Sequence, residues 1–156
     1  MGVVVLVDHA EPRLAAEIVD LQQASYAVEA DLIGFDQIPT QHETASQVSQ
    51  LDLIVLGAVE VDGRLVGILG YRRVDDLVDI DRLAVHPSWF RKGVARSLMH
   101  ALHRREHDAA TFEVSTAAGN TPAIALYASL GYRREPDLPS PAGLTFARFA
   151  RRADPV

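Results

Sequence analysis

Near the middle of the chain, a short basic stretch has residue types that suit the binding of a phosphate group. It runs from His86 to Leu98 as HPSWFRKGVARSL, between an apolar segment and one with helical spacing. Free backbone N–H groups at the start of a helix attract anions, and the helix dipole adds to this attraction. Because Gly93 and Ala95 carry little or no side chain, a pyrophosphate can approach the main chain closely. The stretch therefore predicts an anion-binding loop; a solvated basic first turn of a helix is the alternative interpretation.

Three basic side chains, Arg91, Lys92 and Arg96, add full positive charges to this loop. Two familiar phosphate loops have other spacings. A Walker loop needs a longer interval between its first glycine and Gly-Lys-Ser/Thr, and the dinucleotide fingerprint needs three glycines just after a first strand. Neither pattern occurs in the sequence, so the predicted loop is of another kind.

His100, His103 and His107 share one predicted helix, and the last two stand four residues apart, a spacing at which a helix can present two metal ligands. Glu106 stands directly before His107 rather than directly after the first histidine, so the metalloprotease pattern is not met. We interpret these histidines as part of a polar helix face and predict no metal site.

Composition limits the kind of protein that carries this loop. With 156 residues, 48% of them hydrophobic, the chain is long enough for one packed core, and we predict a single domain over residues 1–156. The net charge of −6 argues against a non-specific nucleic-acid binder and favours cationic small partners. The chain has no cysteine, which excludes thiolate chemistry and suits a cytoplasmic location. No run of about 18 apolar residues is present, so we expect no membrane span.

The elements that must position the loop follow from periodicity and from turn residues. Strands are predicted at 3–7, at 53–74 as a hairpin that turns at Asp62-Gly63, at 78–85, at 110–116 and at 144–152. Helices are predicted at 11–32, within 42–51, at 92–105 and at 120–132. This order predicts a mixed α/β fold with helices on both faces of one sheet.

Two sequence blocks stand on a predicted loop and on a predicted helix. The first is Phe90-Arg91-Lys92-Gly93-Val94-Ala95, and the second is NTPAIALYASLGY at 120–132. Together they resemble the GNAT superfamily of N-acetyltransferases, whose acyl-CoA loop follows Gln/Arg-x-x-Gly-x-Gly/Ala and whose second block follows Asn-x-x-Ala-x-x-x-Tyr-x-x-x-Gly-Phe/Tyr. Phe90 stands where Gln or Arg is usual. The resemblance covers about residues 53 to 135 well and implies a twisted mixed sheet of about seven strands flanked by about four helices.

The resemblance implies that acetyl-CoA is the cosubstrate and that the strands at 78–85 and 111–115 are parallel and diverge around it. Main-chain groups of Leu83, Ala84 and Val85 are expected to pair with the pantetheine arm like an added strand. A backbone N–H near Leu83 or Ala84 is then placed to donate to the thioester oxygen. The remaining expected contacts are Phe90, Arg91, Lys92, Gly93, Val94, Ala95, Arg96, Ser97, Asn120, Ala123 and Tyr127. Asn120 is also a good cap for its own helix.

Direct acyl transfer needs a neutral amine, and therefore a base, because an alkylamine is mostly protonated near neutral pH. On a regular strand, the period of two places Asp79 and Asp81 on one face with Leu83 and Val85. We expect Asp79 to be the base, and Asp81 to anchor the substrate or to be an alternate base. The alternative is an edge-like or solvent-facing pair of aspartates, or an ion pair with a nearby arginine: Arg72, Arg73 or Arg82.

Tyr127 stands where the superfamily commonly has the general acid that protonates the CoA thiolate. From the residues alone, an ordinary core aromatic is the alternative. The resemblance also implies an acceptor pocket between the first two helices, with the predicted loop EPDLPSPAG at 135–143 as its other wall. The candidates for this pocket are Tyr26, Glu29, Phe35, Ile38, Pro39, His42 and Glu43, of which the two glutamates are candidates for holding a cation.

These expectations combine into one function. We expect an acetyl-CoA-dependent N-acetyltransferase that transfers the acetyl group directly to an amine of a small molecule or peptide, without an acyl-enzyme. A non-catalytic acyl-CoA-binding or sensing module on the same fold is the alternative, and an unrelated phosphate-binding α/β domain is a second one. The sequence leaves the amine acceptor and a homodimer open. No nucleic-acid, membrane or metal partner is expected.

Overall fold

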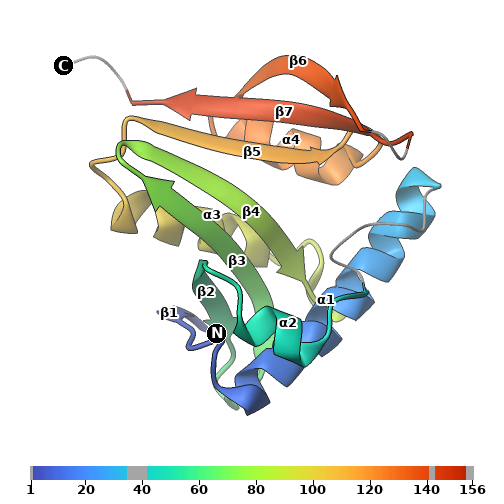
Figure 1. The fold of residues 1–156 in the computed structure, drawn as a ribbon, viewed down its shortest axis with the longest axis vertical. Coiled ribbons are helices and arrows are strands. Elements are labelled where there is room, and N and C mark those ends of the chain that lie inside the picture. The colour runs from blue at the N-terminus through green and yellow to red at the C-terminus, as the bar shows by residue number, and fades with distance from the viewer. Residues whose placement is uncertain (1, 35–41, 141–142, 154–156) are drawn as a thin grey trace.

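The computed structural model describes residues 2–34, 42–140 and 143–153 (Figure 1). Its strands are β1 (Val3–Leu6), β2 (Ile54–Val59), β3 (Leu65–Val74), β4 (Leu77–Val85), β5 (Thr111–Ala117), β6 (Arg133–Pro139) and β7 (Thr145–Arg152). Its helices are α1 (Pro12–Ile33), α2 (Ala45–Ser49), α3 (Val94–Arg105) and α4 (Thr121–Ser129), with a short 3₁₀ helix at Pro87–Trp89. The strands form one seven-stranded sheet in the order β1-β2-β3-β4-β5-β7-β6.

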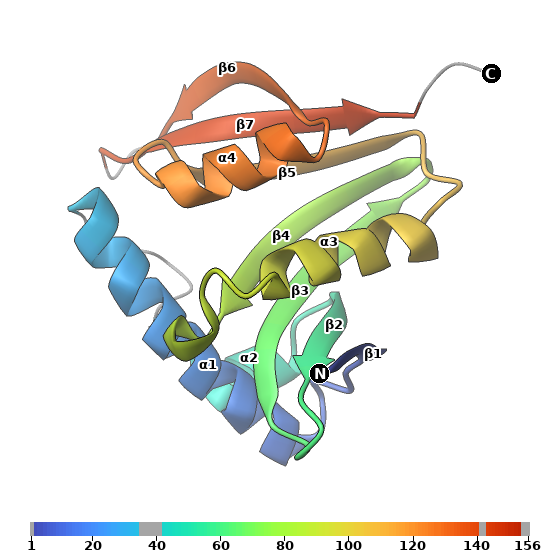
Figure 2. The same cartoon turned by 180° about the vertical axis from the view of Figure 1, so that it is seen from behind.

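Among the described strands, β4 and β5 form the one parallel pair, and every other neighbouring pair is antiparallel. α3 and α4 cover one face of the sheet over the larger core, and α1 and α2 cover the other face over the smaller core. Figures 1 and 2 show these two helical layers from opposite sides. The predicted mixed α/β fold is confirmed. None of the described helices is long and apolar enough to cross a membrane.

Much of the segment predicted as a loop before the last strand is itself a strand. β6 includes residues 135–139 of this segment and pairs with β7 at one edge of the sheet. Pro136 and Pro139 lack the N–H that a central strand needs, but an edge strand has no neighbour on one side. The register between the two strands also shifts between Glu135 and Leu138. The loop prediction is wrong at these residues because an edge position tolerates the prolines that favour a loop.

β4 contains a bulge at Asp81. Ile80 pairs with Tyr71 of β3 and Arg82 pairs with Gly70, so Asp81 is an extra residue without an opposite partner. An extra residue on one strand shifts the alternation of its side chains by one position. On one face of the sheet, β4 therefore presents even-numbered residues such as Ile80 before the bulge and odd-numbered residues such as Leu83 after it.

The predicted common face of Asp79 and Asp81 with Leu83 and Val85 is therefore wrong. Ahead of the bulge, Ile80 packs into the core under α3 and α4, which puts both aspartates on the opposite face. Beyond the bulge, Leu83 packs against that same core. The period of two holds only for a regular strand, and no residue type in this segment marks the bulge.

Arg82, the residue after the bulge, has its guanidinium buried, and only 6% of its side chain is exposed. Its Nη1 donates to Gln22 Oε1 at 3.0 Å and to Glu43 Oε1, and its Nε donates to Asp81 Oδ2 at 2.7 Å. Arg72 Nη1 donates to the other oxygen of Asp81 at 3.1 Å. We call Gln22, Glu43, Arg72, Asp81 and Arg82 the Arg82 cluster. It ties β4 to α1 and to the residues before α2, and it confirms the ion-pair interpretation for Asp81.

Replacing Arg82 tests how much this cluster stabilises the fold. Arg82→Met should lower the free energy of unfolding by about 3–5 kcal/mol, because it leaves Glu43 and Gln22 without their cation in a largely buried position. Urea unfolding followed by circular dichroism measures the loss. Arg72→Met is the matched control, since Arg72 is 41% exposed and should contribute less than about 1 kcal/mol. Equal losses in the two variants would contradict this account.

Candidate functional site

β4 and β5 run side by side for only part of their length and then diverge. Their pairing joins Leu77–Ile80 to Thr111–Val114. Beyond these positions, the facing edges of residues 81–85 and 115–117 have no strand partner among the described residues. Both views show the two ribbons separating toward the end of α1 (Figures 1 and 2). We call this region the fork. Its unpaired N–H and C=O groups can pair with an extended ligand, and the divergence that the resemblance implied is confirmed.

The predicted anion-binding loop lies between β4 and α3. The helix begins at Val94 rather than at the predicted Lys92, because Arg91 (φ 62°) and Gly93 (φ 81°) have left-handed backbone conformations. The N–H of Ser97 donates to the carbonyl of Gly93 at 2.9 Å. No described residue accepts from the first three N–H groups of α3, and no side chain caps the helix. A Cβ added at Gly93 meets no atom within 4 Å, so the space beside the loop is open.

The basic side chains of this loop have no ion-pair partner in the described part of the chain. Arg91 and Lys92 are exposed, and Arg96 donates to Ser129 Oγ of α4 at 2.8 Å. Phe90 is 39% exposed and offers no polar contact at the position where the family usually has Gln or Arg. Free N–H donors and uncompensated positive charge therefore occur together, which suits a pyrophosphate.

Tyr127, the predicted general acid, lies on α4 with 3% of its surface exposed. Its ring contacts the rings of Tyr132 and Phe149, so it is also a core aromatic. Burial raises the pKa of its hydroxyl, and the charges of Tyr132, Glu29 and Tyr26 act in the same direction. The phenol therefore keeps its proton at neutral pH and can serve as a donor.

Asn120 connects α4 to α1. Its Oδ1 accepts from the backbone N–H of Ala123 at 3.3 Å and so caps α4, as predicted. Its side chain also hydrogen-bonds to Glu29 of α1. Burial raises the pKa of Glu29, and the hydrogen bond with Asn120 lowers it by a smaller amount. The contact of Asn120 with a pantetheine arm stays a prediction.

The C-terminal half of α1 lies at the open end of the fork (Figures 1 and 2). Tyr26 is buried in the smaller core, which also contains Ala84 of β4. Ile33 lies against Gly119, where an added Cβ would stand 3.3 Å from Ile33 Cγ2. Glu29 falls between Tyr26 and Ile33 on the same side of the helix. α1 therefore contacts β4 and the turn that follows β5, and it brings Tyr26 and Glu29 close to α4.

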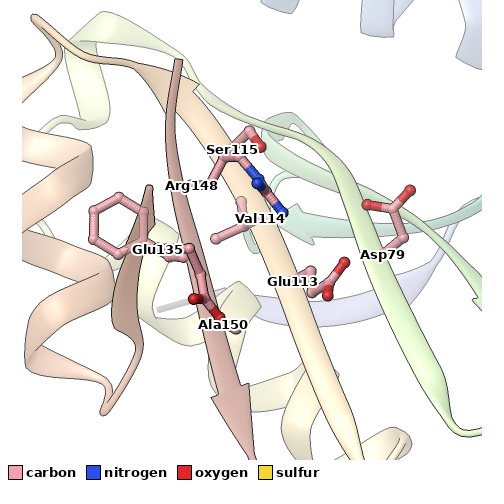
Figure 3. Close-up of a pocket in the computed structure, with 8 residues that line it drawn as sticks. Asp79, Glu113, Val114, Ser115, Glu135, Arg148 and Ala150 are labelled. Atoms are coloured by element: carbon pink, nitrogen blue, oxygen red, sulfur yellow. The ribbon is translucent and has the colours of Figure 1, made fainter. Parts of the chain in front are cut away.

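Asp79, the predicted base, lies on the paired part of β4, ahead of the fork. Its side chain is exposed, and its Cα is opposite that of Glu113 on β5. With Ser115, Glu135 and Arg148, these acids line a hollow of about 50 Å³ on the sheet (Figure 3). Glu113 was not singled out from the sequence, because its position beside Asp79 depends on the register of two strands that are distant along the chain.

The other predicted acceptor-binding residues fall in different places. Glu43 belongs to the Arg82 cluster, so its charge is compensated. His42 is exposed just before α2. Phe35, Ile38 and Pro39 lie outside the described residues.

His103 departs from the predicted polar helix face. His100 and His107 are exposed, but the ring of His103 is partly buried and stacks on Tyr132. Burial lowers the pKa of His103 to about 4, and the charges of Arg151 and His100 act in the same direction. The neutral ring accepts from Arg151 at Nδ1 (2.8 Å), while its Nε2 lies 2.8 Å from the Tyr132 hydroxyl. Within the described ranges, no group of three or more metal-ligating side chains is arranged to hold a metal ion.

Comparison with known proteins assigns this chain to one family. Residues 15–132 match the Acetyltransferase (GNAT) family. The match covers well over half of the chain, and the chain belongs to this family. The two sequence blocks had indicated the same family.

Individual relatives agree with this assignment. UPF0157 protein YqkA of Bacillus subtilis (strain 168) is 34% identical over 141 residues, which are 90% of this chain and 41% of that protein. The chain thus spans about two-fifths of the length of this relative. The ribosomal-protein-S18-alanine N-acetyltransferase of Escherichia coli has a TM-score of 0.76 at 20% identity, over 97% of this chain and 94% of that one. The PaiA N-acetyltransferase of Thermoplasma acidophilum, solved with coenzyme A, has a TM-score of 0.75 at 13% identity, over 95% and 98%. These structures share the fold.

Proposed function

We propose that this protein is an acetyl-CoA-dependent N-acetyltransferase that transfers the acetyl group directly to an amine of a small molecule or peptide. One observation carries the proposal: the free N–H groups at the start of α3 follow directly on β4, whose last residues form one arm of the fork. An extended thioester with a pyrophosphate at one end fits both features. The coenzyme A complex of the Thermoplasma acidophilum PaiA protein, which shares the fold, supports this ligand class.

The fork and the neighbouring helix α4 supply groups for a direct transfer. As the amine nitrogen bonds to the thioester carbon, a backbone N–H near Leu83 or Ala84 donates to the carbonyl oxygen, where negative charge develops. The carbon–sulfur bond then breaks, and Tyr127 donates a proton to the leaving sulfur. The chain has no cysteine to carry an acyl group, which favours transfer without an acyl-enzyme.

Release of free CoA thiol in the presence of a panel of amines tests the activity itself. The panel contains amino acids, polyamines, aminoglycosides and peptides with free N-termini or lysines. We expect turnover of at least one class, with a rate that rises with pH as the amine loses its proton. Tight binding of acetyl-CoA without acetylation of any amine would favour a non-catalytic acyl-CoA-binding module instead.

Gly93→Val tests the pyrophosphate site. The added side chain enters the open space beside the loop, so acetyl-CoA affinity should fall by at least about tenfold, measured by calorimetry. Gly63→Val in the β2–β3 turn is the matched control, because its φ of +87° is close to the +81° of Gly93 and its added Cβ also meets nothing within 4 Å. Both variants carry similar backbone strain, and only one should lose affinity. Equal affinity in the two folded variants would contradict the site.

Tyr127→Phe separates the general acid from the core aromatic. The ring contacts remain and only the hydroxyl is lost, so stability and acetyl-CoA affinity should stay close to the wild-type values. We expect kcat to fall by roughly 10–1000-fold in the thiol-release assay. Tyr132→Phe is the matched control, since it removes a nearby hydroxyl that bonds to His103 and not to the fork. An unchanged kcat for Tyr127→Phe, with chemistry rate-limiting, would leave Tyr127 a core residue only.

A further inference from the structure

We propose that Glu29, carried by α1 to the open end of the fork, is the base that takes the proton from the attacking amine. This inference rests on the proposed N-acetyltransferase activity. A primary amine with a pKa of about 10 is mostly an ammonium ion near neutral pH, and it cannot attack until it loses a proton. The base must reach the amine directly or through one water molecule, close to where the fork holds the thioester.

Position separates Glu29 from the other acids near β4. Asp81 and Glu43 hydrogen-bond to the buried Arg82, so their charges are already compensated. Asp79 is exposed and lies ahead of the fork, where β4 and β5 are still paired. A base placed there would lie beside the paired strands and not where their unpaired edges can hold the thioester. Among these acids, Glu29 is the one that contacts the helix of the predicted proton donor.

Contacts on both sides of Glu29 fix the direction in which it points. Tyr26, one turn earlier on α1, is buried in the smaller core. Ile33, one turn later, lies against Gly119 in the turn between β5 and α4. Asn120 hydrogen-bonds to Glu29 itself. Rotation of α1 that moved the carboxylate away from the fork would break all of these contacts.

The surroundings of Glu29 suit a base that works at neutral pH. Burial raises the pKa of its carboxyl by more than the hydrogen bond with Asn120 lowers it, so the carboxylate accepts a proton more readily than an exposed one. No lysine or arginine of the described ranges forms an ion pair with it. Within the described ranges, Tyr127 on α4 is close enough to Glu29 and Tyr26 for their charges to raise its pKa.

The proton balance of the step is complete with these groups. The ammonium ion gives one proton to Glu29, and the neutral nitrogen bonds to the thioester carbon. As the carbon–sulfur bond breaks, Tyr127 protonates the sulfur and regains a proton from the nitrogen. The products are the amide, the free thiol and one proton on Glu29, which leaves to solvent. No oxidant, metal or further reactant enters.

Glu29→Gln tests the assignment, with the amine found in the thiol-release screen as the acceptor. We expect kcat/KM to fall by about 10²-fold or more at pH 7, and the gap to wild type to close as pH rises toward the pKa of the amine. The acid limb of the wild-type pH profile, which includes protonation of Glu29, should be replaced in the variant by a rise that follows only the loss of the proton from the amine. Acetyl-CoA affinity should change by less than about twofold, and thermal stability should not fall, since glutamine retains an oxygen for Asn120 and removes a buried charge.

Two further variants make the result specific. Asp31→Asn is the matched control: it is an exposed carboxylate on α1, two residues beyond Glu29 and on the opposite side of the helix, and its profile should equal that of wild type. Asp79→Asn is the competing assignment. If the pH-dependent loss appears in Asp79→Asn and not in Glu29→Gln, Asp79 is the base and this inference is wrong.

Other outcomes also overturn the inference. A Glu29→Gln variant that loses activity equally at every pH shows a structural role, and one that raises only the KM of the amine shows an anchor for the ammonium ion. In both cases an active wild type leaves the proposed function intact. A wild type that binds acetyl-CoA and acetylates no amine at any pH overturns the proposed function, and the role of Glu29 with it.

Discussion

Burial of one guanidinium at the bulge of β4 is the constraint on which the fork depends. Arg82 has only 6% of its side chain exposed, and a charge removed from water is costly unless its donors find partners. Those partners come from α1, from Glu43 ahead of α2 and from Asp81 in the bulge itself. The same contacts therefore hold the bulge in place, decide which face Leu83 occupies and keep α1 against β4.

α1 extends the effect of this cluster from β4 to the residues that follow β5. The helix is continuous from Pro12 to Ile33. The hydrogen bond of Gln22 with Arg82 therefore also fixes the direction of the later turns of the helix. Those turns reach the end of β5 and the cap of α4 at Asn120. The buried Arg82 cluster thus helps to set where the predicted acceptor-binding residues Tyr26 and Glu29 lie.

The features that could be predicted from the sequence are those that depend on residues close together along the chain. The loop at Gly93, the helix of Tyr127, the strands and their mixed order all follow from spacing, small residues and turn signals. The bulge at Asp81 could not be predicted, because one inserted residue leaves no mark in the amino-acid composition. As a result, the side chains of β4 beyond the bulge were assigned to the wrong face of the sheet. The proximity of Glu29 to Asn120, and of Glu113 to Asp79, arises only when distant segments pack. Residues 135–139 of β6 were predicted as a loop for a related reason, since their prolines are acceptable only at an edge that the whole sheet defines.

The contacts of α1 with β4 and with the turn after β5 also bear on how a ligand enters the fork. Two parallel strands with unpaired facing edges would otherwise tend to close and complete their hydrogen bonds. Here folding itself holds them apart, so the binding surface is preorganised before any ligand arrives. We therefore expect the proposed thioester ligand to meet a protein backbone that is already ordered, so that little conformational entropy is lost on the protein side. We also expect its association to be limited by diffusion and aided by the basic loop, and not limited by a slow opening of the sheet.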